Sequence, residues 1–122
     1  MSVNGLKGLR VLLVEDEMIV AMHIEDVLRD AGCEIVGRAG TLQSALALVR
    51  DEPLDIALLD VNLDGDPTYP IAEELDARGI PFVLATGYGQ SMLPEQWRNR
   101  PCLRKPFTDG QLEDAVRRVT HR

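Results

Sequence analysis

Several apolar runs of this chain end directly at a side chain that can take part in chemistry: three carboxylates, one hydroxyl and one ammonium. If the runs are parallel strands of one sheet, their carboxyl ends lie at one edge, so these side chains meet in a single cleft. Such a cluster suits a hard divalent cation beside a phosphoryl group. The residues are Glu15 and Asp16 after the run 11–14, Asp60 after 56–59, Thr86 after 82–85, and Lys105 after a shorter run.

Glu15, Asp16 and Asp60 would repel one another at such an edge, and a divalent metal removes that repulsion. Ligands that are all oxygen suit magnesium better than zinc, which favours nitrogen and sulfur. The backbone carbonyl of Asn62, two residues after Asp60, can add a further oxygen. The alternative for the pair Glu15 and Asp16 is that they only open the following helix, where negative charge meets the positive end of the helix dipole. Asp60 has no such capping position.

Asp60 is the candidate nucleophile. One of its carboxylate oxygens can attack phosphorus to form an acyl phosphate, with the metal and Lys105 offsetting charge on the transferring oxygens. Thr86 supplies a hydroxyl that can donate to a phosphoryl oxygen, although a β-branched residue can also simply end a strand. The chain has no phosphate loop with Walker spacing and no Ser or Cys nucleophile elbow.

Length and composition indicate one folded domain in the cytoplasm. The chain has 122 residues, of which 45% are hydrophobic, and no run long enough to cross a membrane or to act as a signal peptide. Its net charge of −7 opposes sequence-independent binding to nucleic acid. The two cysteines, Cys33 and Cys102, lie in apolar segments without metal-ligand spacing and are expected to be structural.

Apolar runs alternate with segments of helical period, which predicts a parallel sheet covered by helices on both faces. The central strand is expected at 55–61, because it is apolar almost throughout. We expect a doubly wound sheet in the order 2-1-3-4-5, in which the first and third strands flank the point where ligands bind. The predicted strands cover residues 10–14, 34–39, 55–61, 80–85 and 102–104.

Four segments have a clear helical period. Between Gln90 and Arg100 the pattern is interrupted by Pro94, so we expect only a short or frayed helix there. Residues 62–67 are rich in Asp, Gly and Pro and are expected to form a loop. The clear helices are delimited by Gly32 after the first, Thr41 and Pro53 around the second, Pro70 and Gly79 around the third, and Thr108 with Gln111 before the last.

These residues resemble, together and in order, the receiver domain of two-component response regulators. The resemblance covers essentially the whole chain and implies a single receiver domain at 1–122 with a flavodoxin-like α/β fold. It also implies a phosphoacceptor in a phosphorelay rather than an enzyme with its own substrate. The residues that carry the resemblance are the acidic pair at 15 and 16, Asp60, Thr86 and Lys105-Pro106-Phe107.

The resemblance further implies a role for each site residue. Asp60 accepts a phosphoryl group from a phosphohistidine of a sensor histidine kinase or a histidine phosphotransfer protein. Thr86 and Lys105 contact that group, and phosphorylation shifts the segment after the fourth strand and so changes partner binding. Mg²⁺ is bound by Glu15, Asp16, Asp60 and the backbone carbonyl of Asn62.

The turn after the fourth strand is similar to a subgroup with the pattern Phe-Ala-Thr-Gly-x-Tyr, which is common in alphaproteobacteria and often associated with HWE or related histidine kinases. Here the turn is Ala85-Thr86-Gly87-Tyr88, and Leu84 stands where the subgroup has Phe. Gly87 replaces the usual Ala or Ser, and Cys102 stands where many receivers have a switching Tyr or Phe. The common coupling between Thr and Tyr is therefore not expected in this chain.

We hypothesise instead that Tyr88 takes over part of the signalling, with its loop and the following weak helix ordering upon phosphorylation. The alternative is that Tyr88 is a surface aromatic that packs on Trp97 or Met92.

Two other functions compete with the phosphoacceptor. A small aspartyl-phosphate hydrolase would share the carboxylate, magnesium, threonine and lysine, but it usually needs a second acid where this chain has Asn62. A receiver-like module without phosphotransfer would only dock proteins, although nothing in the set of five residues indicates that loss. We expect no DNA-binding or enzymatic output domain within the 122 residues, so any effect passes through a downstream protein partner.

Overall fold

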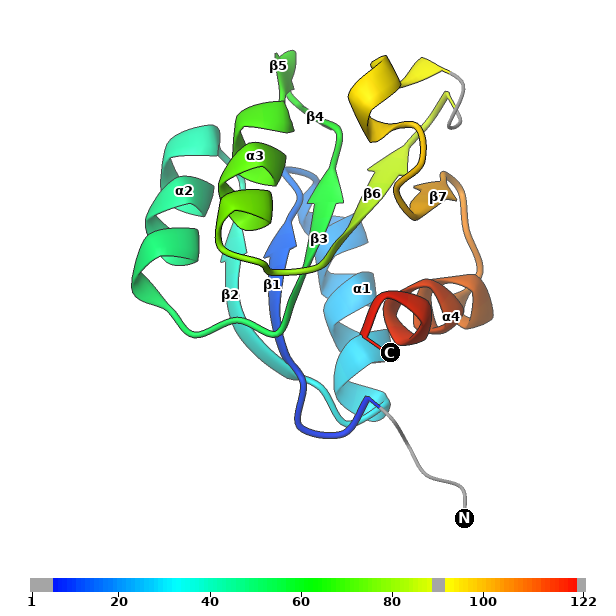
Figure 1. Ribbon diagram of the computed structural model, residues 1–122. Coiled ribbons are helices and arrows are strands. Elements are labelled where there is room, and N and C mark those ends of the chain that lie inside the picture. The colour runs from blue at the N-terminus through cyan, green and yellow to red at the C-terminus, as the bar shows by residue number, and fades with distance from the viewer. Residues whose placement is uncertain (1–5, 89–91, 121–122) are drawn as a thin grey trace.

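The computed structural model describes residues 6–88 and 92–120. At its centre lies a parallel sheet made of β1 (Arg10–Val14), β2 (Glu34–Ala39), β3 (Ile56–Asp60), β6 (Phe82–Thr86) and β7 (Cys102–Arg104). The strands follow the order β2-β1-β3-β6-β7 (Figure 1). This confirms the predicted order 2-1-3-4-5, with β3 as the central strand.

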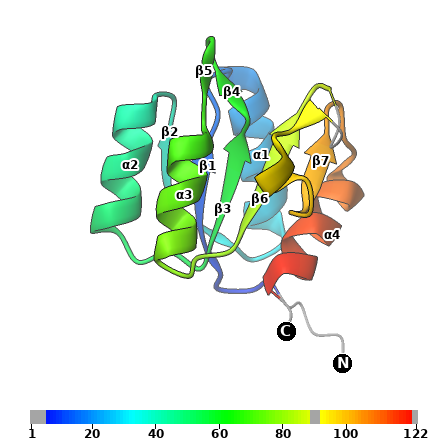
Figure 2. The ribbon, with the colours of Figure 1, turned by 45° about the horizontal axis from the view of Figure 1, so that its top comes forward.

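Helices cover both faces of the sheet, as Figure 2 shows from a second direction. On one face lie α1 (Met18–Asp30) and α4 (Asp109–Thr120), and on the other α2 (Leu42–Asp51) and α3 (Tyr69–Ala77). Strand β6 supplies both layers, since Val83 and Ala85 pack with the first pair of helices and Phe82 and Leu84 with the second. Burial on both sides explains why the strands are almost wholly apolar in sequence.

The strands are in register at the edge where they end. Val14 pairs with Leu59, and Asp60 pairs with Ala85. The residues that follow or close these strands are Glu15, Asp60 and Thr86, and they therefore reach the same edge of the sheet.

The predicted capping residues are confirmed. The Thr41 hydroxyl accepts from the Ser44 N–H at 3.1 Å. The Thr108 hydroxyl accepts from the Gln111 N–H at 3.1 Å, while the Gln111 side chain accepts from the Thr108 N–H at 2.8 Å. Each pair satisfies backbone donors that a helix start leaves open, which fixes where α2 and α4 begin.

Residues 62–67, which we expected to be a plain loop, form a short antiparallel hairpin of β4 (Asn62–Leu63) and β5 (Asp66–Pro67). Its two-residue turn has Asp64 at φ 49° and Gly65 at φ 93°. Positive φ at both positions is what a type I′ hairpin turn requires. The Asn62 side-chain oxygen accepts from the Gly65 N–H at 2.7 Å and closes the turn.

The weak helix expected at 90–100 is, in its described part, a single 3₁₀ turn, η2 (Glu95–Trp97). Residues 89–91 lie outside the described part of the chain. Trp97 is buried, stacks on Tyr69 with ring centroids 6.3 Å apart, and meets Phe82 edge-on at 5.9 Å. Tyr88 is 78% exposed and is therefore a surface aromatic, and it lines the same cavity as Met92.

No helix within residues 6–88 and 92–120 has both the length and the apolar character needed to cross a bilayer.

Candidate functional site

The three predicted carboxylates lie together at the carboxyl edge of the sheet. Glu15, Asp16 and Asp60 each offer one oxygen, and these oxygens lie within 4.8 Å of one another. Glu15 and Asp60 are buried and Asp16 is exposed, so the cluster opens to solvent on one side. Oxygen ligands of this kind fit a hard divalent cation such as Mg²⁺.

Lys105 reaches this cluster from the end of β7. Its ammonium nitrogen lies 3.0 Å from Oε1 of Glu15 and 3.1 Å from Oδ2 of Asp60. Burial raises the pKa of Glu15, and the hydrogen bond from Lys105 partly opposes that shift. Burial also lowers the pKa of Lys105, but its hydrogen bond to Glu15 and the nearby charge of Asp60 outweigh this and leave the pKa raised. The lysine therefore stays charged at neutral pH.

Asp60 is held through both its side chain and its backbone. The Asn62 N–H donates to Oδ1 of Asp60 at 3.2 Å. The fully buried Thr68 hydroxyl donates to the backbone oxygen of Asp60 at 2.7 Å. This role of Thr68 was not predicted, because a threonine between a turn and a helix has no pattern that points to a strand end eight residues earlier.

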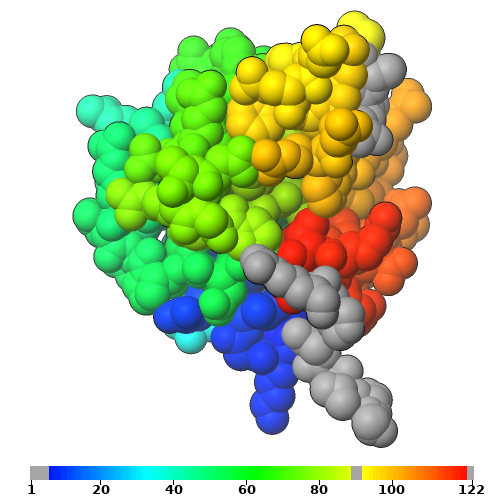
Figure 3. Space-filling model, viewed as in Figure 1, coloured from blue at the N-terminus to red at the C-terminus, as the bar shows by residue number. Residues whose placement is uncertain are grey.

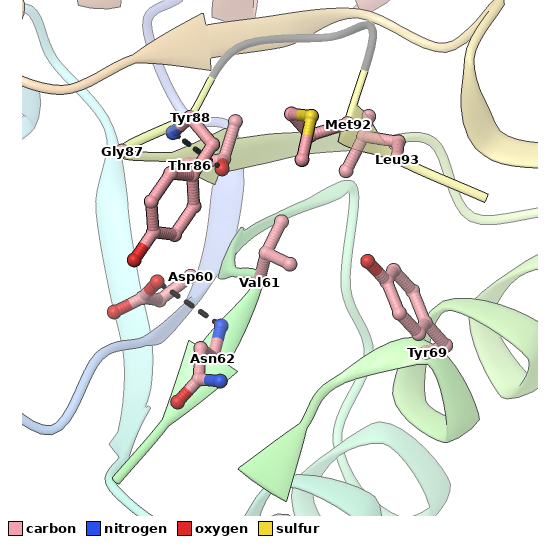
Figure 4. Close-up of a pocket in the computed structure, with 9 residues that line it drawn as sticks. All are labelled: Asp60, Val61, Asn62, Tyr69, Thr86, Gly87, Tyr88, Met92 and Leu93. Carbon is pink, nitrogen blue, oxygen red and sulfur yellow. Dashed lines mark hydrogen bonds between the residues drawn. The ribbon is translucent and has the colours of Figure 1, made fainter. Parts of the chain in front are cut away.

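Thr86 lies on the same small cavity as Asp60. Its backbone oxygen accepts from the Lys105 N–H at 2.8 Å, and its hydroxyl accepts from the Tyr88 N–H at 3.1 Å. Figure 4 shows the Tyr88 ring extending toward the Asp60 carboxylate. The cavity measures about 160 Å³ and is lined by Asp60, Val61, Asn62, Tyr69, Thr86, Gly87, Tyr88, Met92 and Leu93.

All the predicted side chains therefore come together, since the acids, Thr86 and Lys105 share one edge of the sheet. Tyr69 and Leu93 also line the cavity and were not predicted as part of it. Neither residue belongs to a motif that indicates chemistry. The packing of α3 and of the segment after β6 brings them to the site.

Fold and site together define a phosphoacceptor signalling module rather than an enzyme. The profile of the response regulator receiver domain matches residues 11–117, and the chain belongs to that family.

Within this family the chain is similar to SdrG. The solution structure of SdrG from Sphingomonas melonis Fr1 is 42% identical, with a TM-score of 0.81 and coverage of 98% of each chain. A BeF3-activated conformation of SdrG from Pseudomonas melonis Fr1 is 41% identical, with a TM-score of 0.77 and coverage of 98% of this chain and 99% of that one. These similarities agree with the alphaproteobacterial subgroup expected from the turn after Thr86.

A second relative is the transcriptional regulatory protein PdtaR of Mycobacterium tuberculosis, which is 33% identical over 111 residues. The match covers 88% of this chain and 54% of PdtaR. This chain thus spans about half the length of that curated relative.

Proposed function

We propose that Asp60 accepts a phosphoryl group from a phosphohistidine of a sensor histidine kinase or a histidine phosphotransfer protein. An Asp60 oxygen forms a bond to phosphorus while the phosphorus–nitrogen bond of the donor breaks, and its electron pair returns to the imidazole. The observation that carries this proposal is a cluster of three carboxylates whose oxygens lie within 4.8 Å of one another, two of which contact the half-buried ammonium of Lys105. The BeF3-activated conformation of SdrG supports it, because BeF3 mimics a phosphoryl group.

The residues suited to hold Mg²⁺ are Glu15, Asp16, Asp60 and the backbone carbonyl of Asn62. Such a cation, when bound, neutralises charge on the transferring oxygens. Lys105 already offsets part of the negative charge of Glu15 and Asp60. Asp16 makes no ion pair among the described residues. Its carboxylate is exposed, so a cation can bind on the open side of the cluster.

Thr86 and Lys105 are assigned to the phosphoryl group. The Lys105 ammonium lies 3.1 Å from Oδ2 of Asp60, so it can stabilise negative charge that develops at this carboxylate during the transfer. The Thr86 hydroxyl accepts a bond from Tyr88 N–H, which leaves its own hydrogen free to donate to a phosphoryl oxygen.

The proposed output is a change in the segment after β6. The acyl phosphate carries about −1.5 to −2 charges where the Asp60 carboxylate carried one. When the Thr86 hydroxyl turns toward this group, the Tyr88 backbone, whose N–H donates to that hydroxyl, would be displaced with it. Tyr88, which is 78% exposed, would then present a different surface to a downstream protein.

The test is incubation of the whole chain with acetyl phosphate and Mg²⁺, followed by mass spectrometry. We expect the mass of one phosphoryl group on the wild type and none on Asp60→Asn. Asp64→Asn is the matched control, because it removes an exposed acid from the neighbouring turn, and it should behave as the wild type. Chelation of Mg²⁺ should abolish the gain in all of them.

Phosphate gained by Asp60→Asn would refute the assignment. If no variant gained phosphate from acetyl phosphate or from a phosphorylated kinase, the chain would be a docking module without phosphotransfer. In the proposed function residues 1–122 act as one receiver unit, in the cytoplasm, where ATP is available to charge a histidine kinase.

A further inference from the structure

Thr68 occupies a helix-capping position but directs its side chain away from the helix. It is the N-cap residue of α3, and its backbone oxygen accepts from the N–H groups of Ile71 and Ala72 at 2.9 and 3.2 Å. A threonine at this position ordinarily accepts a backbone N–H of the helix through its hydroxyl as well. Within α3, whose residues are all described, the Thr68 hydroxyl accepts no such bond, and it donates instead to the backbone oxygen of Asp60 at 2.7 Å. The hydroxyl therefore serves the end of β3 and not its own helix.

The bond from Thr68 closes a loop between the proposed phosphoacceptor and the start of α3. Thr68 is fully buried, and its N–H donates to the backbone oxygen of Val61 at 2.9 Å. The N–H of Val61 in turn donates to the backbone oxygen of Ala85 on β6 at 2.9 Å. Thr68 thus binds the carbonyls of both Asp60 and Val61, and Val61 is also tied to the sheet.

The closed loop contains the β4–β5 hairpin, which carries the proposed carbonyl ligand of Mg²⁺. Asn62 pairs with Pro67, and Leu63 pairs with Asp66, in antiparallel register. The hairpin reaches the surface at the top of the space-filling view, in green (Figure 3). Asn62 is exposed there, whereas the side chain of Leu63 is buried. Asn62 therefore lies between the anchored Val61 and the buried Leu63, which fixes the direction of its backbone oxygen.

We propose that Thr68 is a positioning residue for the Mg²⁺ site, because its two hydrogen bonds hold Asp60 and the loop that carries the Asn62 carbonyl in place before a cation binds. This inference rests on the proposed function, since it takes the Asn62 carbonyl as a ligand. Mg²⁺ demands a near-ideal octahedral arrangement of oxygens, so oxygens that are already fixed favour its binding. Loss of a residue that orients metal ligands typically weakens metal binding by about tenfold or more.

The first test is calorimetric titration of the unphosphorylated chain with Mg²⁺. Thr68→Val nearly keeps the shape of the side chain but removes the hydroxyl, so we expect the Kd for Mg²⁺ to rise by about tenfold. Thr68→Ser keeps the hydroxyl, and its Kd should stay within about threefold of the wild-type value. Ile56→Val is the matched control, because it removes one buried methyl group at the other end of β3, and it should change the Kd less than about twofold.

Amide hydrogen exchange of the metal-free chain, followed by NMR, gives a second measurement that needs no cation. The Gly65 N–H donates to the Asn62 side chain at 2.7 Å and therefore reports on the closed hairpin. We expect this N–H to exchange about tenfold faster in Thr68→Val than in the wild type, and at the wild-type rate in Ile56→Val. Such a difference would show that Thr68 holds the hairpin before any cation is bound.

Timed phosphorylation by acetyl phosphate separates this inference from the proposed function. For Thr68→Val we expect the Mg²⁺ concentration at half-maximal rate to rise by about tenfold, while the maximal rate stays within about threefold of the wild-type rate. A wild type that binds Mg²⁺ but gains no phosphate would refute the proposed function alone. The Kd values and the hydrogen exchange of the variants would then still decide the role of Thr68.

Three results would overturn the role of Thr68: an unchanged Kd for Mg²⁺ in Thr68→Val, an equal rise of the Kd in Ile56→Val, or an equal rise in Thr68→Ser. A wild type that binds no Mg²⁺ would overturn it as well, and so would a Thr68→Val chain whose Gly65 N–H exchanges at the wild-type rate. If urea denaturation shows that Thr68→Val does not fold, Thr68→Ala takes its place with the same expected results.

Discussion

Lys105 Nζ lies 3.1 Å from Oδ2 of Asp60, so a cation supplied by the chain itself already occupies one oxygen of the proposed phosphoacceptor. The same nitrogen lies 3.0 Å from Glu15. Lys105 and a divalent cation therefore compete for the same carboxylates, while both would favour the arrival of a phosphoryl group.

Substitution Lys105→Gln is expected to tighten Mg²⁺ binding by about tenfold, because one positive charge leaves the cluster. The same substitution should slow phosphorylation by acetyl phosphate by about tenfold or more, because the charge that stabilises the transferring oxygens is lost. Calorimetric titration with Mg²⁺ and timed mass spectrometry measure the two effects. Lys7→Gln removes an exposed lysine far from the sheet edge and should change neither. Weaker Mg²⁺ binding in Lys105→Gln would contradict the competition.

Thr68→Val is expected to lower the free energy of unfolding by about 1 to 2 kcal/mol, because it leaves the buried backbone oxygen of Asp60 without its donor. Urea denaturation measures the loss. Thr120→Val is the control, since the Thr120 hydroxyl donates to a carbonyl near the exposed end of α4, and it should cost less than about 0.5 kcal/mol. Equal effects of the two substitutions would argue against a special role for the bond to Asp60.

Trp97→Ala is expected to cost about 3 to 5 kcal/mol of unfolding free energy, because Trp97 is only 3% exposed and contacts two aromatic rings. Tyr88→Ala should cost less than about 0.5 kcal/mol, because its ring is 78% exposed. The same denaturation experiment compares the two. If Tyr88→Ala proved as costly as Trp97→Ala, Tyr88 would be a packing residue and not a free surface for signalling.

The ion pair between Arg10 and Asp55 predicts a pH dependence of stability. Hydrogen bonds from Arg10 lower the pKa of Asp55 below its ordinary value of 3.8, although burial opposes them. A carboxyl whose pKa is lowered by folding stabilises the protein above its unfolded pKa, and this contribution is lost as the pH falls through its folded pKa. The stability difference between the wild type and Asp55→Asn should therefore be constant from pH 7 to about pH 5 and shrink below about pH 4. A difference that grew toward low pH would have the wrong sign.

The sheet order and most of the site could be predicted because they depend on short-range patterns. Strands buried on both faces are apolar runs, and parallel strands bring the residues that follow them to one edge. The positions of Glu15, Asp60 and Lys105 at the ends of strands were therefore enough to predict that they lie together. The capping residues Thr41 and Thr108 are equally local, since their partners lie three positions away.

The features that were missed depend on contacts between distant segments or on competing local preferences. The stacking of Tyr69 on Trp97 joins α3 to η2, and no periodicity reports it. The segment around Trp97 is a single 3₁₀ turn, which agrees with the short or frayed helix expected there. The hairpin at 62–67 was missed although Asp64-Gly65 is a common turn pair, because strands of two residues leave too short an apolar pattern to recognise.

The interior consists of two layers that share only the sheet between them, with α1 and α4 on one side and α2 and α3 on the other. Leu28 and Leu75, for example, belong to different hydrophobic clusters, and the two clusters have no residue in common. The energetic effects of substitutions in the two layers should therefore add when combined. One layer can accordingly be repacked to raise the thermal stability of the protein while the packing of the other layer stays unchanged.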